Sequence, residues 1–272
     1  MAVIVLSQQI GSRGNELGRL TAERLGYRFV SGEEIVAEAA SRYGVSADQL
    51  LVFDLRTPHF WQRGKADSHR YLAFVRAVML RELAADKIVA AGRILAHQAP
   101  AAGCAMRIRV TAPFATRVRQ VAADDKMEAH AAEKYVRDYD RELRERNQSL
   151  TGVDIEDSAL YDLVVNSAAH PLDTVAAMIA GGARILDETA PPQARESLRD
   201  AALAAQVRAA LLAHPKVRDA QIAVQCAGGA IRLAGPGLVA PWDAMVIEVA
   251  RQVEGVSAVE VATEEMPIPL TE

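Results

Sequence analysis

The sequence predicts an α/β protein: a parallel sheet with helices on both faces, followed by a small α+β domain of order αββαβ. Residues 2–6 form a continuous apolar run with β-branched side chains, which is typical of a strand buried on both faces. Strand and helix patterns then alternate over the first two thirds of the chain, as in a parallel sheet. A polar stretch with two consecutive prolines separates this region from a shorter one with its own strands.

The elements of the larger region follow in order from the first strand. The spacing of Leu17, Leu20 and Leu25 predicts a helix over residues 15–25, and Gly26 stands where a helix commonly ends in a left-handed residue. The other expected strands are residues 27–30, 87–91, 107–111 and 161–166. The other expected helices are residues 32–40, 71–84, 113–122, 128–146 and 171–186.

The segment DETAPPQARES, at residues 187–197, is the predicted boundary between two domains. After it, the spacing of apolar residues indicates a helix, a hairpin that turns at Gly228-Gly229, a second helix and a last strand. We therefore expect a domain at residues 1–186, a linker at 187–197, a domain at 198–264 and a tail at 265–272.

Composition excludes several classes of protein. Half of the 272 residues are hydrophobic, which is enough for a sizeable core, and the net charge of −4 gives no general attraction to nucleic acid or anionic membranes. Cys104 and Cys226 lie far apart and predict neither a disulfide framework nor a zinc site. We read no signal peptide and no membrane span, so we expect a cytoplasmic protein. The oligomeric state stays open.

A glycine loop, Gly11-Ser12-Arg13-Gly14, lies between the first strand and the first helix. Such a loop directs backbone N–H groups and the positive end of the helix dipole at one place, where a phosphate fits. The standard P-loop ends Gly-Lys-Ser/Thr, but here Gly14 occupies the lysine position and Asn15 the next. Arg13 can replace part of the missing charge. A tight turn without a ligand remains the alternative at this point.

The loop resembles that of bacterial cytidylate kinase-like proteins, which belong to the P-loop nucleoside monophosphate kinase type and carry S-R-x-x-G-S-G-G-x-x-I there. The chain reads SQQIGSRGNEL over residues 7–17. The resemblance continues in the same order at Ser31-Gly32, Gly92-Arg93, Arg117 and Tyr161-Asp162-Leu163. The chain departs from the pattern at Gln8, Arg13, Val30 and Val36.

The resemblance implies ATP with Mg²⁺ as phosphoryl donor and no metal site built from protein side chains. It implies that the donor phosphates bind Gly11, Ser12, Arg13, Gly14 and Asn15. Ser31 and Arg93 would hold the acceptor. The catalytic charges would come from Arg13, Arg117, Arg137 and Arg141, because phosphoryl transfer needs positioning and positive charge.

The long charged helix resembles the lid of these kinases, in which an aspartate is followed three residues later by an arginine. Asp138 with Arg141 fits that spacing. If the lid is aligned by counting from Tyr161, the aspartate of the pattern instead falls at Asp140. The position of the arginine is then occupied by Leu143. Either aspartate could orient the lid arginines, and the helix could also be a solvated one with internal ion pairs.

The smaller region resembles a BON domain, a type of interaction module, and would bind a ligand or a protein partner. Taken together, the resemblances predict a nucleotide-binding kinase that transfers the γ-phosphoryl group of ATP to CMP, dCMP or a related monophosphate. One alternative is an inactive nucleotide-binding regulator that signals through the BON-like domain. A kinase for another small phosphate ester is a weaker one.

Overall fold

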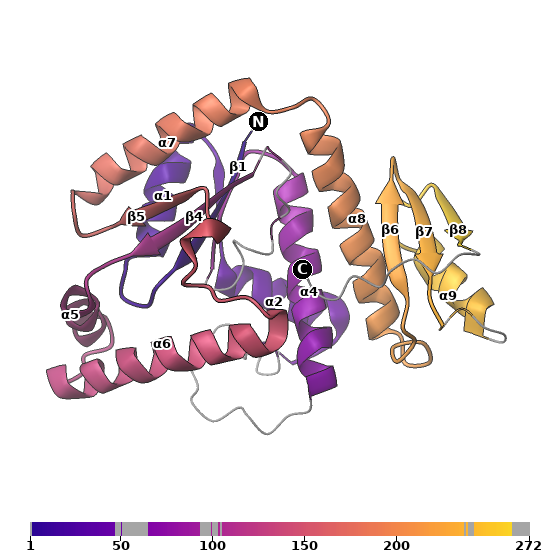
Figure 1. Cartoon of the computed structure of the whole chain (residues 1–272), viewed down its shortest axis with the longest axis horizontal. Helices are drawn as coiled ribbons and strands as arrows, with labels where there is room; N and C mark the ends of the chain where they lie inside the picture. Colours follow the sequence, from indigo (N-terminus) through magenta and orange to yellow (C-terminus); the bar gives the residue numbers. More distant parts are fainter. Residues whose placement is uncertain are drawn as a thin grey trace.

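The computed structural model describes residues 2–46, 50, 65–92, 99, 103, 105–236, 238 and 242–262. Its larger sheet has five parallel strands in the order β2-β3-β1-β4-β5 (Figure 1). The strands are β1 (Val3–Gln8), β2 (Arg28–Ser31), β3 (Ile88–Gly92), β4 (Ala105–Thr111) and β5 (Leu163–Asn166). The predicted parallel sheet is therefore confirmed.

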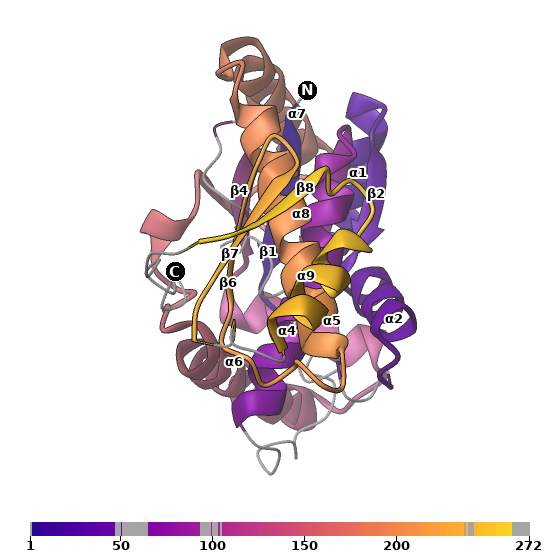
Figure 2. The same ribbon diagram turned by 90° about the vertical axis from the view of Figure 1, so that its right-hand side faces the viewer.

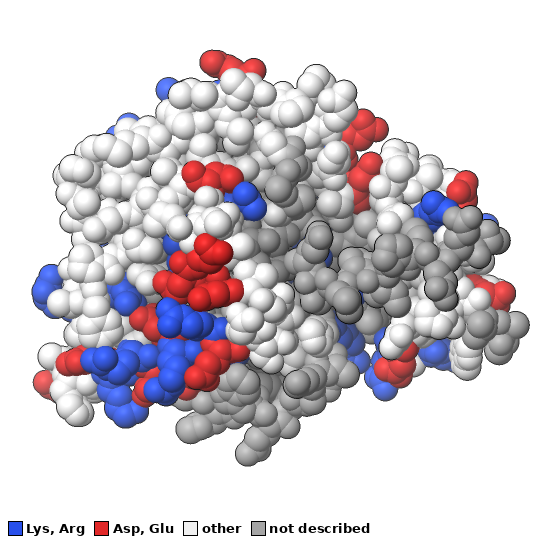
Figure 3. All heavy atoms as spheres, viewed as in Figure 1, with Lys and Arg blue, Asp and Glu red and all other residues white. Residues whose placement is uncertain are grey.

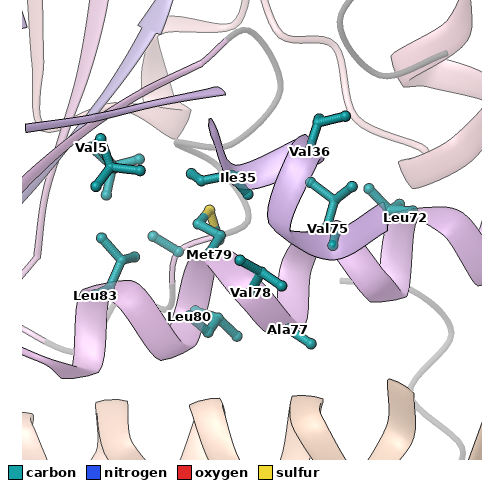
Figure 4. Close-up of a cluster of buried hydrophobic side chains, with 14 of the residues drawn as sticks. Val5, Ile35, Val36, Leu72, Val75, Ala77, Val78, Met79, Leu80 and Leu83 are labelled. Atoms are coloured by element: carbon teal, nitrogen blue, oxygen red, sulfur yellow. The ribbon is translucent and has the colours of Figure 1, made fainter. Parts of the chain in front are cut away.

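Helices cover both faces of this sheet. They are α1 (Gly14–Leu25), α2 (Gly32–Tyr43), α4 (Lys65–Ala84), α5 (Phe114–Asp124), α6 (Ala129–Thr151) and α7 (Leu172–Thr189). Side chains alternate along β1: Ile4 and Leu6 pack with α1 and α7, whereas Val3 and Val5 pack with α2 and α4. Figure 4 shows Val5 of β1 and Ile35 of α2 on the same side of α4. The first strand is thus buried on both faces, as its apolar run predicts.

Local capping residues determine where α1 ends and where α2 starts. Helix α1 ends at Gly26, which has φ +66°, a conformation that glycine adopts without strain. Helix α2 is capped by Ser31, whose hydroxyl accepts a hydrogen bond from the Glu34 N–H while the Glu34 carboxylate accepts one from the Ser31 N–H. This capping box places the start of α2 directly at the end of β2.

The C-terminal unit has its own sheet, in the order β6-β7-β8, with β6 and β7 antiparallel and β8 parallel to β7. Its elements are α8 (Ala194–Ala213), β6 (Ala223–Ala227), β7 (Ala230–Ala234), α9 (Trp242–Arg251) and β8 (Ala258–Val261). Ile231, Leu233 and Val246 form the centre of a separate small core. The predicted αββαβ order is confirmed. Residues 263–272, which include the expected tail, lie outside the described part.

Residues 187–197 differ from the polar linker expected there. Helix α7 extends to Thr189 and α8 begins at Ala194, so the two prolines interrupt helical structure over only 190–193. Proline lacks the N–H and clashes with the preceding turn, which accounts for the break. The division of the chain into the domains 1–186 and 198–264 stays a prediction.

Helix α8 contributes to both cores. Leu198 and Ala202 pack into the main core against α4, whereas Val207 and Leu211 belong to the small core. Figure 2 shows the small sheet and α9 in front of α8, with α4 behind it. The C-terminal unit therefore connects to the larger sheet through a packed helix. No helix in the described ranges is long and apolar enough to cross a membrane.

Candidate functional site

The glycine loop follows β1 at the carboxyl edge of the sheet, the usual side for ligands in open α/β sheets. The Gln9 N–H donates to the Val110 carbonyl at 3.0 Å, and the Ser12 hydroxyl donates to the Gln9 carbonyl at 2.7 Å. Helix α1 starts at Gly14, and its first backbone hydrogen bond runs from the Leu17 N–H to the Arg13 carbonyl. The amides of the first turn thus point out of the helix toward the loop.

Gly11 brings the loop against helix α5. It has φ +72°, and a Cβ there would lie 2.5 Å from the carbonyl oxygen of Arg117. Both the backbone conformation and the close approach require glycine. The loop and the start of the arm formed by α5 and α6 are therefore held in contact at this residue.

Gln8 and Gly14 reverse the arrangement of a standard loop, because the long side chain stands at residue 8 and the glycine at residue 14. With Gly14 at the lysine position, the first glycine of the P-loop pattern falls at Gln8. A Cβ at Gly14 would lie 2.3 Å from Gln8 Oε1 and 2.6 Å from Gln8 Cβ. The Gln8 amide also donates to Asn15 Oδ1 at 2.7 Å. The space in which a lysine would begin is therefore filled from the opposite side of the loop.

Arg13, the predicted substitute for the lysine charge, is paired with a carboxylate on its own helix. Its Nε and Nη2 atoms donate to Glu16 at 2.8 and 2.6 Å, and both side chains are about half exposed. Exposed ion pairs contribute little and are exchanged easily. The arginine lies at the start of α1 as predicted, but Glu16 offsets its charge in this arrangement.

The expected acceptor residues are only partly described. Ser31 caps α2, and its backbone hydrogen bond holds the pKa of the Glu34 carboxyl below its usual value. A Cβ at the next residue, Gly32, would come within 3.3 Å of the Gly92 Cα, so the ends of β2 and β3 approach closely here. Arg93 lies outside the described residues.

Arg117 connects the loop, α5 and α6. Its guanidinium makes two hydrogen bonds to Asp140, at 3.0 and 2.8 Å, and a third to the Ala112 carbonyl at 3.2 Å. The residue is only 5% exposed. Its ring neighbour is Phe114, 5.5 Å from the guanidinium carbon. Of the two lid aspartates, the structure thus places Asp140 against a predicted catalytic arginine.

The other lid residues lie on the exposed face of α6. Asp138 pairs with Lys134 at 2.5 Å and with Arg141 at 2.8 Å, and the Lys134 hydrogen bond is the main cause of its lowered carboxyl pKa. Arg137 pairs with Glu133 at 2.8 Å. Figure 3 shows acidic and basic side chains intermixed on the face over α6. These arginines are accessible, whereas Leu143, three residues after Asp140, is buried.

Sequence reasoning did not single out Arg109, which is buried in β4 beside the loop. The available signal was its position: an arginine inside the strand RIRVT, where a buried strand normally carries apolar residues. Within the described part of the chain, no group of three or more histidine, cysteine or acidic side chains could hold a metal ion.

A glycine loop between a buried parallel strand and a helix, with a helical arm in contact with it, is the arrangement of the nucleoside monophosphate kinase-like fold. The comparison with protein families then gives the particular group. The model described as "Cytidylate kinase-like family" matches residues 3–169, and the chain belongs to this family.

Similar curated proteins are archaeal, whereas bacterial relatives were expected. The cytidylate kinase of Thermococcus kodakarensis is 24% identical over 180 residues, covering 65% of this chain and 85% of the relative. That of Desulfurococcus amylolyticus is 28% identical over 169 residues, covering 61% and 84%. An uncharacterized protein from Eubacterium ventriosum has a similar structure, with a TM-score of 0.50, 15% identity and coverage of 69% and 98%. That similarity supports the fold alone.

Proposed function

We propose that the protein transfers the γ-phosphoryl group of ATP, bound with Mg²⁺, to a nucleoside monophosphate, with CMP and dCMP as the first acceptors to test. One observation carries the proposal. Gly11 of the glycine loop packs on the backbone of Arg117, and the buried side chain of Arg117 pairs with Asp140 of α6. A cation fixed between a phosphate loop and a closing arm is what phosphoryl transfer requires.

On the donor side, the N-terminal amides of α1 and the loop residues Gly11, Ser12, Gly14 and Asn15 would bind the ATP phosphates. Arg13 would join them by leaving Glu16, because an exposed ion pair is easily exchanged for a phosphate contact. ATP would bring Mg²⁺, which offsets phosphate charge.

On the acceptor side, Ser31 and Arg93 would hold the monophosphate. Arg137 and Arg141 are exposed on α6, so they can turn to the transferring group when the arm closes, while Arg117 stays fixed. Closure of such an arm would also exclude water, which otherwise competes as acceptor. The chain would thus contribute charge and positioning, and would form no covalent bond to the phosphoryl group.

The test uses the full chain with ATP-Mg²⁺ and a panel of CMP, dCMP, UMP, AMP and other small acceptors. Formation of CDP that is lost in Arg93→Ala, with unchanged thermal unfolding, is the expected result. Arg144→Ala is the matched control, since Arg144 pairs only loosely with Asp154, at 3.7 Å, and has no assigned role. Tight ATP binding without transfer to any acceptor would reject the proposal.

A second candidate is an inactive nucleotide-binding regulator. It gains support from the filled lysine space at Gly14, the pairing of Arg13 with Glu16 and the burial of Leu143. In this function, the αββαβ unit would act as a BON-like module that reports nucleotide binding to a partner. Helix α8 could carry the signal because it packs into both cores. ATP-dependent binding of a partner, without transfer, is the expected result in that case.

A further inference from the structure

Arg109 is a buried cation next to the glycine loop to which the proposed function assigns no role. It lies in β4 directly beside Ser7, the residue of β1 that precedes the loop. Its Nη1 atom donates to the Ser7 hydroxyl at 2.9 Å, and its Nη2 atom donates to the Glu156 carboxylate. The Arg109 side chain is 4% exposed and that of Glu156 is 35% exposed. The pair thus reaches from the interior to the surface.

The strand register places Arg109 on the side of the sheet where the acceptor is expected. Ser7 is flanked by Gly92 of β3 on one side and by Arg109 of β4 on the other. Paired residues of parallel strands face the same way, so all three lie on the same face as Val5 and Ala90, which is the face toward α2 and α4. Arg93, the expected acceptor ligand, follows Gly92 directly.

The energetics of the pair argue against a purely structural role. Taking the charge of Arg109 out of water costs about as much as its attraction to the partly exposed Glu156 returns, so an apolar residue at this position would usually serve stability equally well. In addition, the Nε atom of Arg109 is buried and has no hydrogen-bond partner in the described part of the chain. An interior arginine that is left partly unsatisfied has spare capacity for an anionic ligand.

A second ion pair on the same strand provides the contrast. Arg107 lies two residues nearer the amino end of β4 and faces the same way. Its Nε and Nη2 atoms donate to the two oxygens of Asp162 at 3.2 and 2.9 Å, and its backbone N–H donates to Asp162 at 2.7 Å. These hydrogen bonds raise the pKa of Arg107. This pair fastens the segment before β5 to β4 and lies farther from the loop.

We propose that Arg109 and Ser7 form a subsite for the phosphate of the acceptor, and that Glu156 occupies this subsite when no acceptor is bound. The inference rests on the proposed function for the identity of the ligand. The acceptor phosphate would enter beside Ser7, where Arg109 donates its hydrogen bonds. Glu156 would release Arg109 and turn to solvent, which its partial exposure permits. Arg109 would be a binding residue and Glu156 its competitor.

The test measures binding of CMP, inorganic phosphate and ATP to the full chain by calorimetry, so that it does not depend on turnover. Arg109→Lys should weaken CMP binding by about tenfold, because the guanidinium hydrogen bonds to an anion are lost. ATP binding should stay unchanged. Arg107→Lys and Asp162→Asn are the matched controls and should leave the binding of all three ligands unchanged.

The direction in which Glu156→Gln changes CMP affinity is the decisive result. Removing the competing carboxylate leaves Arg109 without its counter-charge, so CMP should bind about threefold more tightly and should raise the melting temperature more than in the original chain. Weaker or unchanged CMP binding in Glu156→Gln would overturn the subsite. Equal losses of CMP and ATP binding in Arg109→Lys would overturn it as well, as would a chain that binds neither CMP nor phosphate. CMP binding that responds as expected without any transfer would reject only the proposed function.

Discussion

Two arginines of the candidate site carry their charge in opposite ways. Arg117 is buried and bound to Asp140 from another helix, whereas Arg13 is exposed and bound to Glu16 one turn along its own helix. The buried pair has a fixed geometry and joins α5 to α6. The exposed pair is local and exchangeable. Under the proposed function, Arg117 would position the arm and Arg13 would be free to leave Glu16 for a nucleotide phosphate.

Breaking the buried pair should have the largest effect. Asp140→Ala would leave Arg117 as an uncompensated interior charge and should lower the free energy of unfolding by about 3 kcal/mol. Chemical denaturation measures this loss. Asp138→Ala is the control on the same helix, since its carboxylate pairs only with exposed neighbours, and it should change stability little. Equal losses in both variants would remove the distinction between the two aspartates.

Disrupting the contact between the glycine loop and the arm should have the second largest effect. Gly11→Ala places a methyl group against the Arg117 carbonyl in a left-handed conformation, so it should cost about 2–3 kcal/mol and weaken ATP binding. Gly152→Ala is the matched control. It has the same φ of +72° with nothing within 4 Å of the added Cβ, and should cost only about 1 kcal/mol. If the two variants lose equal stability, the close approach at Gly11 is unimportant.

The exchange between Gln8 and Gly14 predicts a compensating pair of substitutions. Gly14→Lys alone should destabilise the fold by about 1–2 kcal/mol, because the new side chain collides with Gln8. Adding Gln8→Gly should recover that stability and strengthen ATP binding, since it places the first glycine and the lysine of the standard loop at residues 8 and 14. A double-mutant cycle of unfolding free energies measures the coupling. Additive effects would contradict the exchange.

The exposed pair should give the smallest change in stability. Arg13→Ala should alter the unfolding free energy by about 0.5 kcal/mol or less, and yet weaken ATP binding. Glu16→Gln should strengthen ATP binding, because Arg13 loses its competing partner. Equilibrium titration with ATP-Mg²⁺ at two salt concentrations measures both. Unchanged ATP affinity in both variants would show that Arg13 takes no part in donor binding.

Local patterns were enough to predict most of the fold. The expected strand at 161–166 begins instead at Leu163, and the expected helix at 71–84 begins at Lys65, because element ends depend on tertiary contacts. The linker expected at 187–197 stays a prediction, although α8 begins within it, at Ala194, because a polar composition does not exclude a helix that buries one face. The glycine loop was also recognisable from its residues.

The geometry of the site was much less accessible from the sequence. Gln8 and Gly14 were visible as separate departures from the family pattern, but their contact exists only once the loop is folded. Counting residues left the alignment of the lid ambiguous. Arg117 is bound to Asp140, which favours the alignment in which Asp140 is the lid aspartate. Arg109 could not be assigned at all, because its role depends on strand register with Ser7.

The glycine loop and the arm are proposed to transfer a phosphoryl group. Incubation of the full chain with ATP labelled in the γ-phosphate, Mg²⁺ and CMP tests it most directly. The account predicts labelled CDP in amounts that exceed the enzyme many times over, and less of it after Arg141→Ala. Labelled ATP that binds tightly and is recovered intact, with every acceptor of the panel, would contradict it.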